Sequence, residues 1–113
     1  MEFEYNVHNG IGVYTLSGNL IGEHDGMRLA DSFNEEMEEG TLNFVLNLQE
    51  LKHVNSSGLG VFITLLPRAR KKGGELVLVN HSDFIKNLMM ITKLSSVFQI
   101  FDTLEEAAAA LEG

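Results

Sequence analysis

Two adjacent serines stand between an asparagine and a glycine in the segment Asn55-Ser56-Ser57-Gly58-Leu59-Gly60. Asn and Ser are favoured at helix N-caps, because their side-chain oxygens accept from backbone N–H groups that lack an intrahelical partner. Helical spacing of apolar residues follows directly, at Leu59, Phe62, Ile63, Leu66 and Ala69. The pattern predicts a buried strand that leads through a loop, Lys52 to Asn55, into a helix that starts at the serines.

The serine hydroxyls permit two interpretations. In the simpler one, Ser56 or Ser57 only caps the helix. In the other, one serine accepts a phosphate, which adds about −1.5 to −2 charges beside the positive end of the helix dipole and its N–H donors. Such a phosphate would repel a partner that had packed against the uncharged surface. Gly58 and Gly60 are poor helix formers, so we expect a partner backbone or a phosphate to approach closely there.

Catalysis by this chain has little support in the sequence. The four histidines are dispersed and show no metal-ligand spacing, and His53 is the only base close to the serines in the sequence. One histidine on the same loop does not make a catalytic triad. Neither a G-x-S-x-G elbow nor a P-loop is present. We therefore expect a protein that is not an enzyme and that holds no metal or cofactor.

Composition narrows the class of protein further. The 113 residues include 44% apolar residues and no cysteine, and the formal net charge is −8. We expect one domain over residues 1–113, without disulfides and in the cytoplasm. The negative charge argues against nucleic-acid binding. No apolar run is long enough to span a bilayer, and Met1 is not followed by the basic start of a signal peptide.

Strands alternate with helices along most of the chain. Alternating apolar residues on both sides of Asn9-Gly10 predict a hairpin, since both turn residues tolerate positive φ. We expect strands at residues 2–7, 11–17, 41–48, 76–79 and 97–101. We expect helices at residues 25–39, from the serine pair to Gly73 with a bend or an early end at Pro67, after an N-cap at Ser82, and after a capping box at Thr103 and Glu106. This order predicts an α/β fold with a mostly parallel sheet.

The segment Asn55 to Val61, preceded by the apolar strand Phe44 to Leu48, resembles the Asp-Ser-Ser-Gly-Leu-Gly signature of STAS domains. In particular it is similar to that of bacterial anti-sigma factor antagonists, and the resemblance covers nearly the whole chain. It implies a four-to-five-stranded mixed sheet with about four helices packed mainly on one side. It also implies a transcription regulator whose unphosphorylated form binds an anti-sigma factor, commonly a serine kinase that phosphorylates the second serine, here Ser57.

The same resemblance implies a partner-binding surface at Asn55, Ser56, Ser57, Gly58, Leu59 and Gly60, with any ATP bound by the partner kinase. Asn55 replaces the family's Asp, so it keeps the capping oxygen but lacks the carboxylate that a kinase could recognise. An alternative is therefore a STAS domain that is never phosphorylated and serves as a scaffold. It would be an accessory of a lipid transporter or a subunit of a stress-signalling complex. Binding of a small ligand or a nucleotide at the same corner is a third reading, supported only by the glycines.

Overall fold

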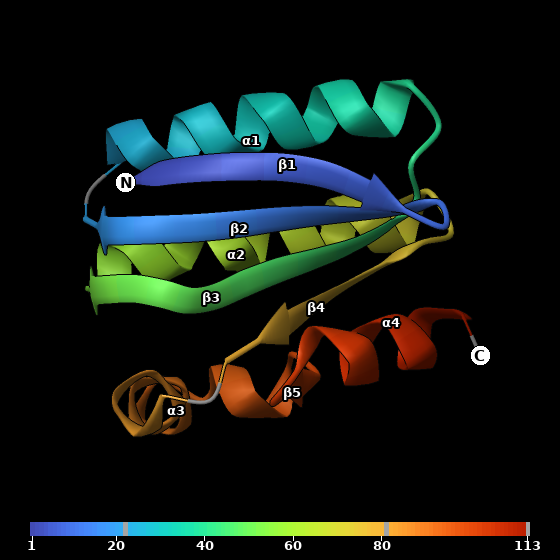
Figure 1. Ribbon diagram of the computed structural model, residues 1–113. Helices are drawn as coiled ribbons and strands as arrows, with labels where there is room; N and C mark the ends of the chain where they lie inside the picture. The colour runs from blue at the N-terminus through green and yellow to red at the C-terminus, as the bar shows by residue number, and fades with distance from the viewer. Residues whose placement is uncertain (22, 81, 113) are drawn as a thin grey trace.

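The computed structural model describes residues 1–21, 23–80 and 82–112, which form one five-stranded sheet with four α-helices (Figure 1). The elements are β1 (Glu2–His8), β2 (Ile11–Leu20), α1 (Glu23–Glu38), β3 (Asn43–Val54), α2 (Ser56–Lys71), β4 (Glu75–Val79), α3 (Asp83–Ile91), the 3₁₀ helix η1 (Leu94–Ser96), β5 (Ile100–Phe101) and α4 (Leu104–Glu112). The strands lie in the order β1-β2-β3-β4-β5, with β1 antiparallel to β2 and all other pairs parallel. The predicted fold class is confirmed.

The hairpin between β1 and β2 turns at the predicted dipeptide. Asn9 has φ 52° and Gly10 has φ 81°, so both residues occupy the left-handed region that a tight hairpin turn requires. The register pairs His8 with Ile11 directly across this turn. The Asn-Gly signal therefore fixes where the first two strands meet.

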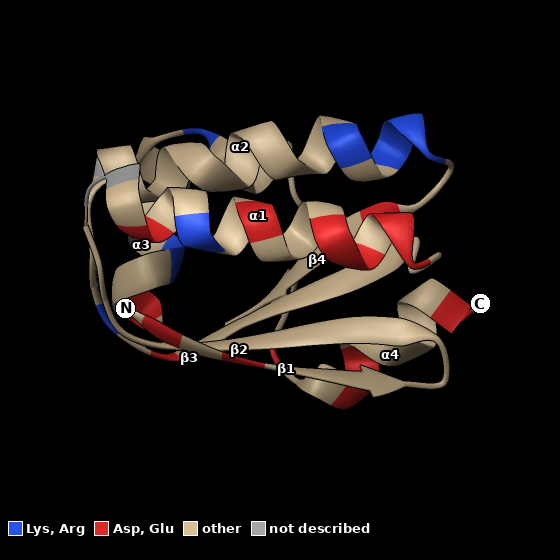
Figure 2. Cartoon of the chain, turned by 90° about the horizontal axis from the view of Figure 1, so that it is seen from above, with Lys and Arg blue, Asp and Glu red and all other residues tan. Residues whose placement is uncertain are grey.

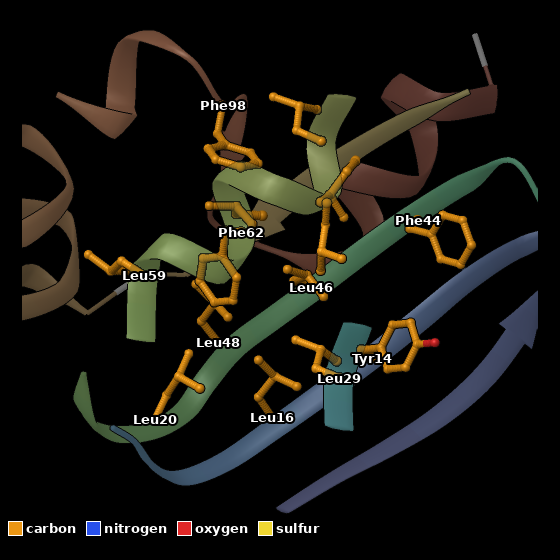
Figure 3. Close-up of a cluster of buried hydrophobic side chains, with 14 of the residues drawn as sticks. Tyr14, Leu16, Leu20, Leu29, Phe44, Leu46, Leu48, Leu59, Phe62 and Phe98 are labelled. Carbon is orange, nitrogen blue, oxygen red and sulfur yellow. The ribbon is translucent and has the colours of Figure 1, made fainter. Parts of the chain in front are cut away.

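The sheet is buried on both faces, by different helices. One face carries Tyr14, Leu16, Phe44 and Leu46 against α1, α2 and α3, and this is the larger core (Figure 3). The other face carries smaller aliphatic residues, among them Val45 and Val77, against α4. Figure 2 shows α1 and α2 on one side of the sheet and α4 on the other. Three helices on one face and one on the opposite face agree with the predicted packing.

Local signals also define two helix boundaries. Gly40, with φ 106°, ends α1: its N–H donates to Met37 O, and Thr41 N–H donates to Glu36 O. This pair of bonds is the Schellman arrangement that favours glycine after a helix. At the start of α4 the N–H of Glu106 donates to Thr103 Oγ1 over 3.2 Å, which is one half of the predicted capping box.

Two strand boundaries differ from the predictions. β3 runs to Val54 instead of ending at Leu48, so residues 52–54 are strand and only Asn55 separates β3 from α2. The extension follows from pairing with β2, which continues to Leu20 opposite Val54 through two register shifts. β5 covers only two residues instead of 97–101, because η1 and its following turn occupy the chain before it and Phe98 packs into the core.

Some details within the helices differ from the predictions. α2 continues past Pro67 to Lys71, close to the predicted end at Gly73, so the alternative of an early end at Pro67 is wrong. Ser82 is the N-cap residue of α3, as predicted, but its side chain makes no capping bond, and its N–H donates to Asn80 Oδ1 over 2.9 Å. Met27 and Ile63 follow the helical spacing of core residues, yet they are 63% and 49% exposed. Within the described residues, no helix combines the length and the apolarity needed to cross a bilayer.

Candidate partner-binding site

Asn55, not a serine, caps helix α2. Its backbone is extended, with φ −109° and ψ 175°, and its Oδ1 accepts from Gly58 N–H over 2.8 Å. The first intrahelical bond runs from Leu59 N–H to Asn55 O. Because the amide oxygen of Asn55 supplies the cap, the interpretation in which Ser57 caps the helix is wrong.

Ser57 is therefore available for other chemistry. It is the second residue of α2, its side chain is exposed, and its hydroxyl makes no hydrogen bond within the described part of the chain. The first turn of α2 contains no acidic residue. An added phosphate would lie at the positive end of the dipole without displacing an existing contact. Ser56 begins the helix, and its side chain lies outside the described residues.

Gly58 and Leu59 serve the fold instead of the surface. A Cβ on Gly58 would lie 2.2 Å from the backbone oxygen of Leu20, so this glycine lets α2 begin directly against the end of β2. The close approach predicted at Gly58 therefore comes from the protein's own backbone. Leu59 is 1% exposed and packs in the larger core. Both residues fix the helix start that presents Ser57.

Gly60, unlike Gly58, faces open space. A Cβ on Gly60 would meet nothing within 4 Å. It lies with Ser57 at a shallow groove of about 350 Å³ between α1 and α2, whose other lining residues are Gly26, Met27, Ala30, Val61, Thr64 and Arg68. The groove joins an exposed methionine, small residues and the Ser57 hydroxyl into one surface. Sequence reasoning missed its α1 side, because Met27 follows the same helical spacing as core residues.

The two helices that form this groove carry charges of opposite sign. Acidic residues lie along α1 and basic residues at the end of α2, on the two helices that run side by side (Figure 2). Arg68 Nη1 donates to Asn34 Oδ1 over 3.3 Å, and Asp25 pairs with the N-terminal amine at 3.2 Å and with Arg28 at 3.6 Å. Among the described residues, no group of three or more His, Asp or Glu side chains could hold a metal ion.

This mixed sheet with its four helices has the arrangement of a known domain family. The STAS domain model matches residues 2–107, so the chain belongs to the STAS domain family. It is 27% identical over 117 residues to the anti-sigma F factor antagonist of Paenibacillus polymyxa, an alignment covering 99% of this chain and 96% of that one.

Solved structures show the same fold. An anti-sigma factor antagonist from Mycobacterium paratuberculosis superimposes with a TM-score of 0.86 at 20% identity, over 99% of this chain and 94% of the other. The phosphorylated form of the Bacillus cell fate determinant SpoIIAA gives a TM-score of 0.73 at 21% identity, over 96% of this chain and 98% of the other. At these identities the structural likeness defines the fold.

Proposed function

We propose that this chain is an anti-sigma factor antagonist, a binding module of the cytoplasm formed by residues 1–113, whose partner is an anti-sigma factor. The observation that carries the proposal is the exposed Ser57 hydroxyl, uncommitted to capping, beside Gly60 and the groove between α1 and α2. The names of relatives such as the anti-sigma F factor antagonist of P. polymyxa support this assignment. The role is to bind and release a protein, with no catalysis by this chain.

Phosphorylation of Ser57 is the proposed switch. An anti-sigma factor that is also a serine kinase would bring ATP, transfer its γ-phosphoryl group to Ser57 Oγ and retain ADP, while the hydroxyl proton is released. The unmodified helix start would bind the partner through Asn55, Ser57 and Gly60, with Ser56 beside them. The phosphorylated one would present about −1.5 to −2 charges to the same surface and lose the partner. The phosphorylated form known for SpoIIAA supports this chemistry on this fold.

Asn55 is compatible with such a switch. Its amide oxygen provides the capping bond to Gly58 N–H, so the helix start needs no carboxylate. A neutral side chain at this position also leaves out a negative charge that would oppose a phosphate two residues away. The difference from the family signature therefore preserves the geometry and favours the charged form of the site.

The test combines modification and binding. The protein is incubated with its anti-sigma factor and ATP, and the site of phosphate is located by mass spectrometry. We expect phosphate on Ser57, loss of partner binding in Ser57→Asp and retained binding in Ser57→Ala. Asn6→Asp, which adds the same charge to an exposed position of β1, is the matched control and should bind normally.

Two results, if found together, would overturn the proposed switch. If Ser57 remains unmodified and Ser57→Asp binds its partner as well as the wild type does, phosphorylation does not regulate the site. Co-purification with membrane-transport or stress-signalling subunits, in place of an anti-sigma factor, would then select the alternative of a scaffolding STAS domain.

A further inference from the structure

A second cavity lies on the opposite side of the sheet from Ser57, between the tip of the β1–β2 hairpin and α4. Its volume is about 270 Å³. The floor consists of Ile11, Val13 and Val45, which are 4%, 5% and 0% exposed, and the wall of α4 adds Leu104 and Ala108. The interior is therefore formed by aliphatic side chains that belong to the smaller core.

The rim of this cavity is acidic. His8, Asn9, Glu105 and Glu112 surround the aliphatic interior, and neither Lys nor Arg is among the described lining residues. Glu105, Ala108 and Glu112 are spaced by three and four positions, so they share one face of α4. Two carboxylates thus flank the apolar wall on the side that faces the sheet.

The position of Glu112 leaves its charge poorly compensated. It lies in the last turn of α4, at the negative end of the helix dipole, where a cation is favoured over an anion. No basic residue occurs in that turn. The hydrogen bond found for its carboxylate comes from the neutral amide of Asn9, Nδ2 to Oε1 over 3.3 Å. A positive charge at the rim beside Glu112 would offset both the negative end of the helix dipole and the Glu112 carboxylate.

We infer that this cavity binds a small aliphatic molecule that carries a protonated amine, such as a short alkylamine. The cavity volume of about 270 Å³ suits a small ligand. It exceeds the volume of about 150 Å³ that holds benzene and lies just below about 300 Å³, where pockets for drug-sized ligands begin. The alkyl chain lies on Ile11, Val13 and Val45, and the ammonium group lies at the rim beside Glu112. The net charge of −8 favours a cation over an anion as the bound species.

The experiment follows backbone amide resonances while n-hexylamine, 1-hexanol or hexanoate is added at neutral pH. The three probes share the alkyl chain and differ in charge. We expect saturable shifts at Val13, Val45 and Ala108 with hexylamine, and binding of hexanol about two- to fivefold weaker, as expected for loss of a partly exposed ion pair. Hexanoate should bind more weakly than hexanol.

Two variants with one control locate the site. Ala108→Phe fills the cavity and should abolish the shifts with every probe, whereas Ala109→Phe, at an exposed position of the same helix, should bind as the wild type does. The double variant Glu105→Gln/Glu112→Gln should bind hexylamine only as well as hexanol, and it decides the question if Ala108→Phe does not fold. Absence of saturable shifts, persistence of binding in folded Ala108→Phe, or hexanoate binding as tightly as hexylamine would overturn the inference.

Discussion

Asn55 and Ser57 lie only two positions apart but differ in what they do for the fold. The Asn55 side chain caps α2 through Gly58 N–H, whereas the Ser57 hydroxyl is exposed and free of hydrogen bonds within the described residues. The fold therefore depends on the first residue and tolerates change at the second. This separation is what a reversible modification requires, because the modified protein must remain folded.

The cap can be tested by a matched pair of substitutions. Asn55→Ala removes the accepting oxygen and should lower the free energy of unfolding by about 1 kcal/mol, within the range of about 0.5–2 kcal/mol found for lost N-caps. Asn55→Asp keeps the oxygen and adds a favourable charge at the helix N-terminus, so its stability should match or exceed that of the wild type. Urea unfolding of the three proteins measures both effects; equal stability of the Ala and Asp variants would contradict the capping role.

Among the elements, the start of α2 depends on its contact with the end of β2. Gly58 lies against Leu20 O, where an added Cβ would be 2.2 Å away, whereas Gly60 faces open space. A single residue, Asn55, consequently separates α2 from β3, and Ser57 is held at a fixed place on the rim of the groove. Gly58 is therefore needed for close packing against β2, whereas Gly60 leaves the surface beside Ser57 open.

Alanine at each glycine should have opposite effects. Gly58→Ala forces α2 away from β2 and should destabilise the protein by about 1–3 kcal/mol or more, as overpacking does. Gly60→Ala improves helix propensity without a clash and should stabilise it by about 0.5–1 kcal/mol. Thermal unfolding of the two variants checks the signs; destabilisation by Gly60→Ala comparable to that by Gly58→Ala would show that the open space at Gly60 is wrongly described.

The order of elements could be predicted from local signals, and their extent could not. Asn9-Gly10, Gly40 and Thr103 act through their own backbone neighbours, so the hairpin and two helix ends were recognised correctly. β3 extends past Leu48 because of its register with β2, a pairing between distant segments that no local pattern reports. The groove likewise joins Met27 and Ala30 to Gly60 of another helix, so only the Ser57 side of the candidate site was visible in the sequence.

For the molecule as a whole, the buried Tyr14 and the partly buried Tyr5 link stability to alkaline pH. Burial raises the pKa of Tyr14 well above its ordinary value near 10. The hydrogen bond to Ser32 Oγ lowers this pKa by less than burial raises it, and Tyr5, Glu36 and Glu35 add smaller increases. Burial also raises the pKa of Tyr5. The folded state thus retains phenolic protons that the unfolded state releases. The free energy of unfolding therefore falls as pH increases above about 10, the ordinary pKa of tyrosine.

Because both pKa values are raised, the stabilisation is fully present below about pH 10 and is lost as pH increases from there. The loss is up to about 1.4 kcal/mol per pH unit for Tyr14 and smaller for Tyr5, which solvent screens. Tyr14→Phe should lower stability at neutral pH by about 0.5–1.5 kcal/mol through the lost hydrogen bond to Ser32. It should also make the alkaline decline shallower. Urea unfolding at a series of pH values measures both quantities, and an unchanged alkaline slope in Tyr14→Phe would contradict the assignment.

The most direct measurement compares the affinity of the unmodified protein and of the protein carrying phosphoserine at position 57 for the same anti-sigma factor, by isothermal titration calorimetry, with thermal unfolding measured in parallel. Placing an unpaired charge in an interface costs about 2 kcal/mol or more, so the phosphorylated form should bind at least ~30-fold more weakly. Its thermal stability should be unchanged or higher, because the helix dipole favours the phosphate. Equal affinity of the two forms, or weaker binding accompanied by unfolding, would contradict a switch built on an exposed serine at the start of α2.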